Sequence, residues 1–400
     1  GRQLAQGAVA QLRAHAPRLP LRVLALVARD QACEHPDRAC HGESCPRARG
    51  FYARLRAARA KAVDELSAGA DTVRTVAQRH RVCPYYLAQD LVRWADVVIA
   101  DYNYWFDLGG LLHALTQAHQ WRIGLLVDEG HNLVARGRAM YSAALEPARP
   151  GAALAAAPAA SKRALQRLRR QWSALAREQS EPYTCSASPP KAFVAAVQKT
   201  ATALGEQLAS EPAEVDPAFL RFHFDLLHFM RVHELHDENW QFDATLDAPA
   251  DVPRSRGAPS ATLCLRNVVP APVLRQRFAA PHCAVVFSAT LAPARFYIDM
   301  LGLPDDTATL AIASPFDPAH LQVRIARHIS TRHADRAASL DALVALIADQ
   351  YARAPGNYIA FFSSFDYLRQ VADRLAQRHP GIGTWRQDPG REEAKRAAVP

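Results

Sequence analysis

The sequence predicts an α/β protein with parallel β-sheets, because short apolar runs alternate with helix-like segments. Buried parallel strands read as continuous aliphatic runs, and such runs occupy 21–27, 97–100 and 123–127. A helix predicted over 110–120 joins the last two into a strand–helix–strand unit. The pattern resumes after residue 310, with strands expected at 321–325 and 358–362 and helices at 337–352 and 365–378. These two stretches predict two sheet domains.

The third apolar run ends in a pair of acids and a histidine, Asp128-Glu129-Gly130-His131. In open α/β sheets, ligands bind beyond the carboxyl ends of the strands, so chemistry is expected here. Asp128 is suited to hold Mg²⁺ against phosphate oxygens, and Glu129 to orient or deprotonate an attacking water. The alternative is a strand that ends in a solvated acidic turn.

Composition is typical of a soluble globular protein, with 22% charged and 49% hydrophobic residues among 400. No apolar run approaches the roughly 20 residues that span a bilayer, and no signal peptide is visible, so a cytoplasmic protein without membrane contact is expected. A net charge of +9 favours a polyanionic partner. Seven cysteines, an odd number, favour metal ligation in a reducing compartment over a disulfide framework.

Four cysteines fall near the N-terminus with the spacing C-x6-C-x4-C-x37-C: Cys33, Cys40, Cys45 and Cys83. Structural zinc sites usually combine two close cysteine pairs, which this spacing lacks. Iron–sulfur clusters accept wider, family-specific gaps between four thiolates. The spacing alone leaves a cluster, a zinc site and unligated cysteines open.

A basic segment without acids follows the third cysteine, at residues 47–61, and contains Phe51 and Tyr52. Basic side chains neutralise phosphates and aromatic rings stack on bases, so this mixture suits single-stranded nucleic acid. A solvated helix face is the competing interpretation. The candidate DNA contacts here and in the nearby aromatic turns are Arg47, Arg49, Arg54, Tyr86, Tyr102 and Tyr104.

The middle of the chain is rich in Ala and Pro and contains a predicted helix over 161–177. Leu165, Leu168, Trp172 and Leu175 form its apolar stripe, and six basic residues accompany them without an acid before Glu178. This helix is interpreted either as a basic surface over DNA or as an ordinary solvated helix. His233-Glu234-Leu235-His236 lacks the His-Glu-x-x-His spacing of zinc proteases, so no catalytic metal is expected there. Cys283, just before an apolar run, is expected to be buried.

Several motifs in order resemble the XPD/DinG family of iron–sulfur superfamily 2 DNA helicases, and its bacterial DinG-type members in particular. They are the four cysteines, the turn at 101–104, Asp128-Glu129-Gly130-His131, Ser288-Ala289-Thr290, the stretch at 314–316 and the run at 358–364. The resemblance extends over about residues 1–396, with a divergent stretch in the middle.

This resemblance implies two RecA-like, P-loop-type motor domains with two insertions in the first. Residues 1–29, 94–139 and 252–300 would form motor domain 1, and 301–400 motor domain 2. The insertions would be an iron–sulfur domain at 30–93 and a mainly helical arch domain at 140–251. Cys33, Cys40, Cys45 and Cys83 would hold a [4Fe-4S] cluster.

The resemblance also implies an ATP-dependent helicase that moves 5′ to 3′ on single-stranded DNA and opens forked DNA in repair or replication, near the nucleoid. Asp128 would bind Mg²⁺–ATP, Glu129 would activate water, and His131 would connect the site to the coupling motif, Ser288, Ala289 and Thr290. Repair or replication proteins are expected partners, without identities.

Two family motifs are missing from the 400 residues. No Gly-x-x-x-x-Gly-Lys-Ser/Thr loop occurs, and Gln387 to Arg391 matches only the first half of the family's terminal arginine motif. The chain is therefore expected to be the central portion of a longer protein, inactive in ATP hydrolysis on its own. The competing function is a non-catalytic nucleic-acid-binding protein with a degenerate helicase fold and a structural metal site. A nuclease or damage sensor is a third option, but no further acidic cluster supports nuclease chemistry.

Overall fold

The structure is a computed structural model of the chain. It describes residues 2–16, 21–36, 38, 40, 42–65, 70–210, 216–246 and 260–387. The chain divides into two units, Gly1–Thr309 and Leu310–Pro400, and each is described by itself. No helix among the described residues is long and apolar enough to cross a membrane.

Two pairs of parallel strands lie in the first unit. β1 (Val23–Ala25) pairs with β2 (Val97–Ile99), and β3 (Gly124–Val127) pairs with β8 (Cys283–Val286). The predicted strands are thus present, and parallel pairing is confirmed. β2 and β3 nevertheless belong to different two-stranded sheets, so the helix between them does not join neighbours of one ladder.

Burial of the third strand was predicted wrongly. Leu126 in β3 is 72% exposed and Val285 in β8 is 51% exposed, while Val127 is buried. A parallel strand is buried on both faces only where further strands and helices cover it, and this pair has no third strand among the described residues. Cys283, at the start of β8, is exposed for the same reason, contrary to expectation.

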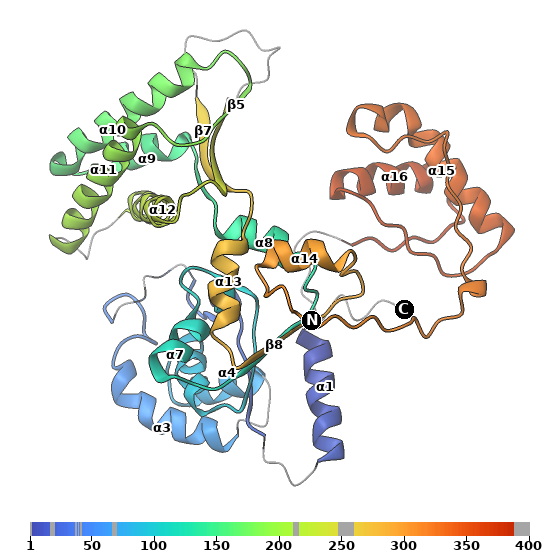
Figure 1. The fold of residues 1–400 in the computed structure, drawn as a ribbon, viewed down its shortest axis with the longest axis horizontal. Coiled ribbons are helices and arrows are strands. Elements are labelled where there is room, and N and C mark those ends of the chain that lie inside the picture. The colour runs from blue at the N-terminus through green and yellow to red at the C-terminus, as the bar shows by residue number, and fades with distance from the viewer. Residues whose placement is uncertain are drawn as a thin grey trace. The chain divides into compact units, whose positions relative to one another are not determined.

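Short helices follow and flank these strands (Figure 1). The first of them is α1 (Arg2–His15). The others of this part are α6 (Asn103–Phe106), α7 (Leu111–His119), α8 (Asn132–Met140), α13 (Ala271–Ala279) and α14 (Ala294–Leu301).

The cysteine-containing region, predicted as a domain at 30–93, folds around a small core that it shares with the segment of β1. Its elements are α2 (Arg29–Ala32), α3 (Phe51–Asp64), α4 (Ala70–Arg79), α5 (Pro84–Leu91) and the 3₁₀ turn η1 (Val92–Trp94). Leu55, Val76 and Leu87 from the three main helices are buried together with Leu24 and Leu26 beside β1. Because the core is shared, this region is packed directly against the first pair of strands.

The predicted arch region contains a sheet that the sequence analysis missed. Its helices are α9 (Ala148–Ala156), α10 (Ala159–Glu178), α11 (Lys191–Ser210) and α12 (Pro217–Glu234). Beside them lies an antiparallel sheet in the order β4 (Ala143–Leu145), β7 (Ala261–Asn267), β6 (Trp240–Leu246) and β5 (Tyr183–Ser186). The expected mainly helical insertion is therefore a helix-and-sheet layer, and β7 pairs with it although 252–300 was predicted to belong to the motor domain.

The antiparallel sheet was missed because its two outer strands, β4 and β5, are brief and pair with segments far away in the sequence. β4 has three residues, and β7 pairs with it from more than a hundred residues away, at Ala143 and Leu265. The predicted helix over 161–177 is confirmed as α10, with Leu165, Leu168 and Trp172 buried in the core of this layer. Trp172 Nε1 also donates to Ala261 O at 2.7 Å, which ties α10 to the start of β7.

The second unit contains helices but no strands among its described residues. α15 (Arg336–Arg353) and α16 (Phe365–Arg378) match the predicted helices and pack around Val344, Tyr367 and Val371. Two 3₁₀ turns, η2 (Pro318–His320) and η3 (His333–Asp335), precede them. The strands predicted at 321–325 and 358–362 are not formed: Val323 is 73% and Phe361 90% exposed. A strand requires a hydrogen-bonded neighbour, and neither segment has one in the described part of this unit.

Candidate active site

The acid-box turn, defined here as residues 128–131, follows β3 directly and lies beside the segment that follows β8. The parallel register pairs Val127 with Val286. Beyond that pair, Phe287 N donates to Val127 O at 3.0 Å, and Gly130 N donates to Phe287 O at 3.0 Å. The carboxyl ends of the two strands therefore place residues 128–131 and 288–290 at one edge, although some 160 residues separate them in the sequence.

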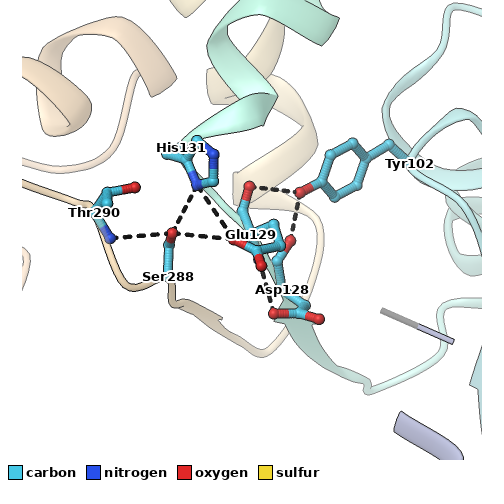
Figure 2. A network of polar contacts seen from close by, with 6 residues as sticks. All are labelled: Tyr102, Asp128, Glu129, His131, Ser288 and Thr290. Carbon is cyan, nitrogen blue, oxygen red and sulfur yellow. Dashed lines mark hydrogen bonds and ion pairs between the residues drawn. The ribbon is translucent and has the colours of Figure 1, made fainter. Parts of the chain in front are cut away.

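Three side chains meet at this edge, as Figure 2 shows. The His131 Nδ1 atom lies 2.7 Å from Ser288 Oγ and 3.3 Å from Glu129 Oε2. Ser288 Oγ donates to the same Glu129 oxygen at 3.3 Å. The structure thus brings together Glu129, His131 and Ser288, three of the residues singled out from the sequence, and their roles stay a prediction.

The rest of the coupling motif follows Ser288 as an exposed turn. Thr290 N donates to Ser288 Oγ at 3.3 Å, and Ala289 lies between them with an exposed side chain. Ser288 thereby receives a backbone N–H on one side and faces His131 and Glu129 on the other. The Ser288 hydroxyl therefore connects this turn directly to the Glu129 carboxylate.

Close packing against β8 explains why the acid-box turn needs a glycine at position 130. A Cβ atom there would lie 2.2 Å from Val286 Cγ1, far inside van der Waals contact. The preceding residue, Glu129, has φ 51°, in the left-handed region that non-glycine residues seldom adopt. The turn is therefore a tightly packed, strained connection between β3 and α8, and strain of this kind persists only where surrounding contacts hold it.

The carboxylates themselves are accessible to solvent. The Glu129 side chain is 52% and the His131 side chain 33% exposed. Asp128 Oδ1 accepts the Glu129 backbone N–H at 2.8 Å, which leaves its other oxygen without a partner in the network of Figure 2. Two adjacent carboxylates open to water are able to receive a hydrated cation and a phosphate ester.

Tyr102 completes this network from another part of the chain. Its hydroxyl donates to Asp128 O and to Glu129 O, the latter at 2.9 Å. Burial raises the pKa of Tyr102 to about 12, with further contributions from Asp128 and Glu129. Tyr104, on the same helical turn, donates to Val27 O at 2.7 Å, just beyond β1. Both hydroxyls are thus used within the protein, although both tyrosines were candidate DNA contacts from the sequence.

The four cysteines lie in the small helical region, at the edges of its helices. Cys33 follows α2 and Cys83 caps the start of α5. Cys45 is buried and Cys40 exposed. Among the residues that the structure describes, no group of three or more His, Cys, Asp or Glu side chains is arranged to hold a metal ion. The predicted ligand set therefore stays a prediction.

The thiols of Cys33 and Cys40 lie close enough to Cys83 to influence its pKa. Burial raises the pKa of the Cys83 thiol, and the thiols of Cys33 and Cys40 raise it further, while the Tyr86 and Tyr85 N–H groups lower it. The His35 N–H also donates to Cys33 Sγ at 3.4 Å. Backbone N–H groups directed at sulfur are suited to thiolate ligands, so the donor chemistry fits an iron–sulfur cluster.

Most of the candidate DNA-binding arginines are engaged inside this region. Arg47 pairs with Glu34 at 2.6 Å, with both side chains mostly covered. Arg54 donates to Arg49 O at 2.5 Å and to Arg81 O at 2.9 Å, and Arg49 donates to Gly42 O at 3.2 Å. Among the aromatics, Tyr52 is 86% and Tyr86 43% exposed. The rings at this surface are thus more accessible than two of the three arginines that were singled out.

One relevant residue gave no signal in the sequence. Arg136 of α8 donates to Asp101 Oδ1 at 3.3 Å and to Asn103 Oδ1 at 3.2 Å, and so joins α8 to the turn that carries Tyr102. It lies far from Asp101 in sequence and in no recognisable motif. Only a tertiary structure reveals this contact.

A cavity of about 490 Å³ between α13 and α14 lies apart from the acid-box network. Its lining includes Arg275, Phe278 and Arg295 but none of the residues of Figure 2. Arg295 is paired there with Asp299 at 2.7 Å and Asp305 at 3.0 Å. The Arg295 charge is therefore compensated by neighbouring carboxylates.

Residues 3–149 match the sequence model of the DEAD_2 family. A comparison with curated proteins finds no match. Three solved structures of similar shape carry the names "XPD_Helicase" (14% identity, TM-score 0.49, 90% of this chain and 62% of that chain), "Truncated XPD" (15%, 0.42, 76% and 82%) and "XPD_APO" (16%, 0.42, 72% and 56%). The chain spans less than two thirds of the first of these. All three TM-scores lie below 0.5, so these similarities do not establish a shared fold.

The family match covers the part of the chain that holds the acid-box turn and all four cysteines. It therefore supports, for that region, the helicase family that the ordered motifs resemble. The comparison leaves residues 150–400 without a family match. Residues 3–149 are thus similar to the DEAD_2 family.

Proposed function

We propose that this chain is part of an ATP-dependent DNA helicase in which the acid-box turn hydrolyses ATP. The observation that carries the proposal is the contact of Glu129 and His131 with Ser288 across the ends of β3 and β8. A motor must connect nucleotide hydrolysis to movement. Here a candidate catalytic carboxylate shares one hydroxyl with a separate segment of the chain, which is the connection that coupling requires.

In this proposal Glu129 orients the attacking water and accepts its proton. The water oxygen attacks the γ-phosphorus, the bond from that phosphorus to the bridging oxygen breaks, and the electron pair leaves with ADP. Glu129 is suited to the role because its side chain is accessible and fixed by Ser288 and His131. His131, in contact with both, transmits the state of the carboxylate to the Ser288 turn.

Asp128 would hold Mg²⁺ together with phosphate oxygens. When bound, the ion neutralises the charge that develops on the phosphates. Magnesium is usually held by only one or two carboxylates, with water and phosphate as its other ligands. The carboxylates of Asp128 and Glu129 therefore fit such an ion, although they do not form a closed group of three protein ligands.

We further propose that Cys33, Cys40, Cys45 and Cys83 hold a [4Fe-4S] cluster that stabilises their region. The donor set is all thiol, and N–H groups face two of the sulfurs. Protein purified without oxygen should carry about four irons per chain and a broad visible absorbance. Bound zinc, without iron or sulfide, would contradict the cluster.

Nucleic acid as the partner is supported by the charge of +9 and by a basic face on α10. We define the α10 basic face by its six exposed cations: Lys162, Arg163, Arg167, Arg169, Arg170 and Arg177. Their side chains point away from the buried stripe formed by Leu165, Leu168 and Trp172. Movement from 5′ to 3′, forked DNA and a role in repair or replication follow from the family resemblance alone.

The decisive experiment is Glu129→Gln. The 400 residues hold no Gly-x-x-x-x-Gly-Lys-Ser/Thr sequence, so DNA-stimulated ATP hydrolysis is measured on the full-length natural protein. Loss of a general base costs about 10²–10⁴-fold in rate, so kcat should fall within that range while ATP still binds. Glu178→Gln, an exposed acid at the end of α10, is the matched control and should be neutral. A Glu129→Gln enzyme within twofold of wild type would exclude the assignment.

A non-catalytic nucleic-acid-binding protein is the second candidate, favoured by the absence of that loop from the sequence. It predicts that the full-length wild-type protein binds single-stranded DNA but hydrolyses no ATP. The helicase proposal predicts both activities, with hydrolysis dependent on DNA. One assay on the wild-type protein separates the two functions.

A further inference from the structure

Two tyrosines on one helical turn fasten the ends of two different parallel sheets. We call residues 101–104 the tyrosine turn. It follows β2 and begins α6. Tyr104 OH reaches Val27 O beyond β1, while Tyr102 OH reaches the carbonyls of Asp128 and Glu129 beyond β3. Since β1–β2 and β3–β8 share no ladder in the described structure, this turn links the two pairs at their carboxyl ends.

The contact from Tyr102 falls on the strained part of the acid-box turn. Glu129 has φ 51°, and its carbonyl accepts both the Tyr102 hydroxyl and the Asn132 N–H, each at 2.9 Å. The next amide, Gly130 N–H, donates to Phe287 O at 3.0 Å. With its carbonyl and the following amide both held, the Glu129 backbone has little freedom to leave the left-handed conformation, which is otherwise unfavourable.

The tyrosine turn is itself held rigidly. Arg136 of α8 bridges Asp101 and Asn103 on either side of Tyr102. Tyr102 also packs edge-on against the buried ring of Phe106, with 6.1 Å between ring centroids. Because the backbone around Tyr102 and its ring are both held, the Tyr102 hydroxyl is already positioned to donate to the two carbonyls. Burial raises the pKa of Tyr102 to about 12, so the hydroxyl keeps its proton to higher pH than an ordinary tyrosine does.

We propose that Tyr102 is a positioning residue whose hydroxyl holds the Asp128 and Glu129 carbonyls, so that the Glu129 carboxylate stays in contact with Ser288 and His131. This inference rests on the proposed ATPase function for its consequence on rate. The physical claim, that Tyr102 orders the acid-box turn, stands apart from that function. Tyr102 touches neither substrate nor metal in this role, because its hydroxyl is directed at backbone carbonyls.

The test is Tyr102→Phe, which removes the hydroxyl and keeps the ring packed on Phe106. Tyr104→Phe is the matched control, since it deletes a hydroxyl from the same turn, but one that donates to Val27 O. Amide hydrogen exchange at Gly130 and Asn132 is measured on both variants. Tyr102→Phe should speed exchange at these amides, and Tyr104→Phe should leave it unchanged.

Kinetics on the full-length protein supply the second readout. Losing the donor should lower kcat for ATP about tenfold, the size of a net hydrogen-bond contribution of about 1.4 kcal/mol. KM for ATP should change by less than about twofold, since the groups that bind phosphate are untouched. Unchanged exchange at Gly130 and Asn132 would overturn the inference, and so would equally fast exchange in Tyr104→Phe. If wild type hydrolyses no ATP, the proposed function fails, yet hydrogen exchange still decides whether Tyr102 orders the turn.

Discussion

The acid-box turn and the basic segment at 47–61 were both singled out from residue types, yet their side chains are held in different ways in the structure. In the first, predicted residues from distant parts of the sequence meet: Glu129 and His131 contact Ser288. In the second, Arg47 and Arg54 are turned toward Glu34 and toward backbone carbonyls of their own region. Side chains at the ends of paired parallel strands are located by register, whereas a long basic side chain on a helix takes whatever acceptor lies near.

This difference has a practical consequence for mutagenesis. Changes in the acid-box turn should act on one geometry that strand pairing maintains. Changes in the basic segment should act partly on folding, because several of its arginines are structural. Four experiments test this contrast, in decreasing order of expected effect.

Of the four experiments, Gly130→Ala should cause the largest loss of stability. The added Cβ would meet Val286 Cγ1 at 2.2 Å, so β8 must shift relative to β3. Overpacking of this kind costs about 1–3 kcal/mol, measured as the free energy of unfolding in urea. Gly109→Ala is the control, because a Cβ there has no atom within 4 Å, and it should change stability by less than about 0.5 kcal/mol. Equal effects of the two variants would show that the strand ends are not tightly packed.

Arg54→Ala should destabilise the cysteine-containing region and not merely weaken DNA binding. It removes the guanidinium that bonds to Arg49 O and Arg81 O, at a cost of about 1–2 kcal/mol in unfolding free energy. Arg56→Ala, from the exposed face of the same helix, should leave stability unchanged. Should both arginines lower DNA affinity alike with no loss of stability, Arg54 would be a DNA contact after all.

The α10 basic face offers the opposite case, a set of exposed cations for which no carboxylate partner is found among the described residues. Arg163, Arg167 and Arg170 are changed together to Gln. If they contact phosphates, the salt dependence of single-strand binding should lose about 2 from its slope, at roughly 0.7 per phosphate. Arg149→Gln is the control, since that guanidinium is paired with Glu146 and Asp225. An unaltered slope in the triple variant means that α10 is simply a solvated helix.

The smallest expected effect is a change in stability at alkaline pH. The pKa of Tyr102 is raised from its ordinary value near 10 to about 12, so the folded protein holds this proton more tightly than the unfolded chain. The stability that results is present below pH of about 10 and is lost as the pH rises toward about 12. The difference in unfolding free energy between wild type and Tyr102→Phe should therefore shrink across that window. A constant difference would mean that the hydroxyl is not held as the structure shows.

Much of the local structure could be predicted because it depends on neighbours in sequence. The stripe of Leu165, Leu168 and Trp172 recurs at helical spacing, so α10 is recognisable and its buried face is correct. The apolar run before Asp128 likewise predicts β3 and the position of the acids at its end. The antiparallel sheet was missed in part because β4, at three residues, becomes a strand only through β7, a partner far away in the chain.

The predicted strands of the second unit show the same limit from the other side. Residues 321–325 and 358–362 have the composition of strands, yet none of them pairs in the described part of that unit, and Ile325 and Ile359 are 79% and 82% exposed. Apolar periodicity indicates only that a segment could be covered. Whether a neighbour is there to cover it is a property of the assembled structure.

At the candidate site, the sequence alone determined which residues are proposed to carry the chemistry: the acids after β3, the histidine two residues later and the serine after β8. Their types and their places at strand ends are local properties that a reader of the chain can find. The tertiary structure alone decided that Glu129 adopts a left-handed backbone, that Gly130 lies against Val286, and that Tyr102 serves carbonyl groups. These depend on which atoms lie opposite one another across β3, β8 and α6, and no spacing along the chain encodes a distance between segments that meet only on folding.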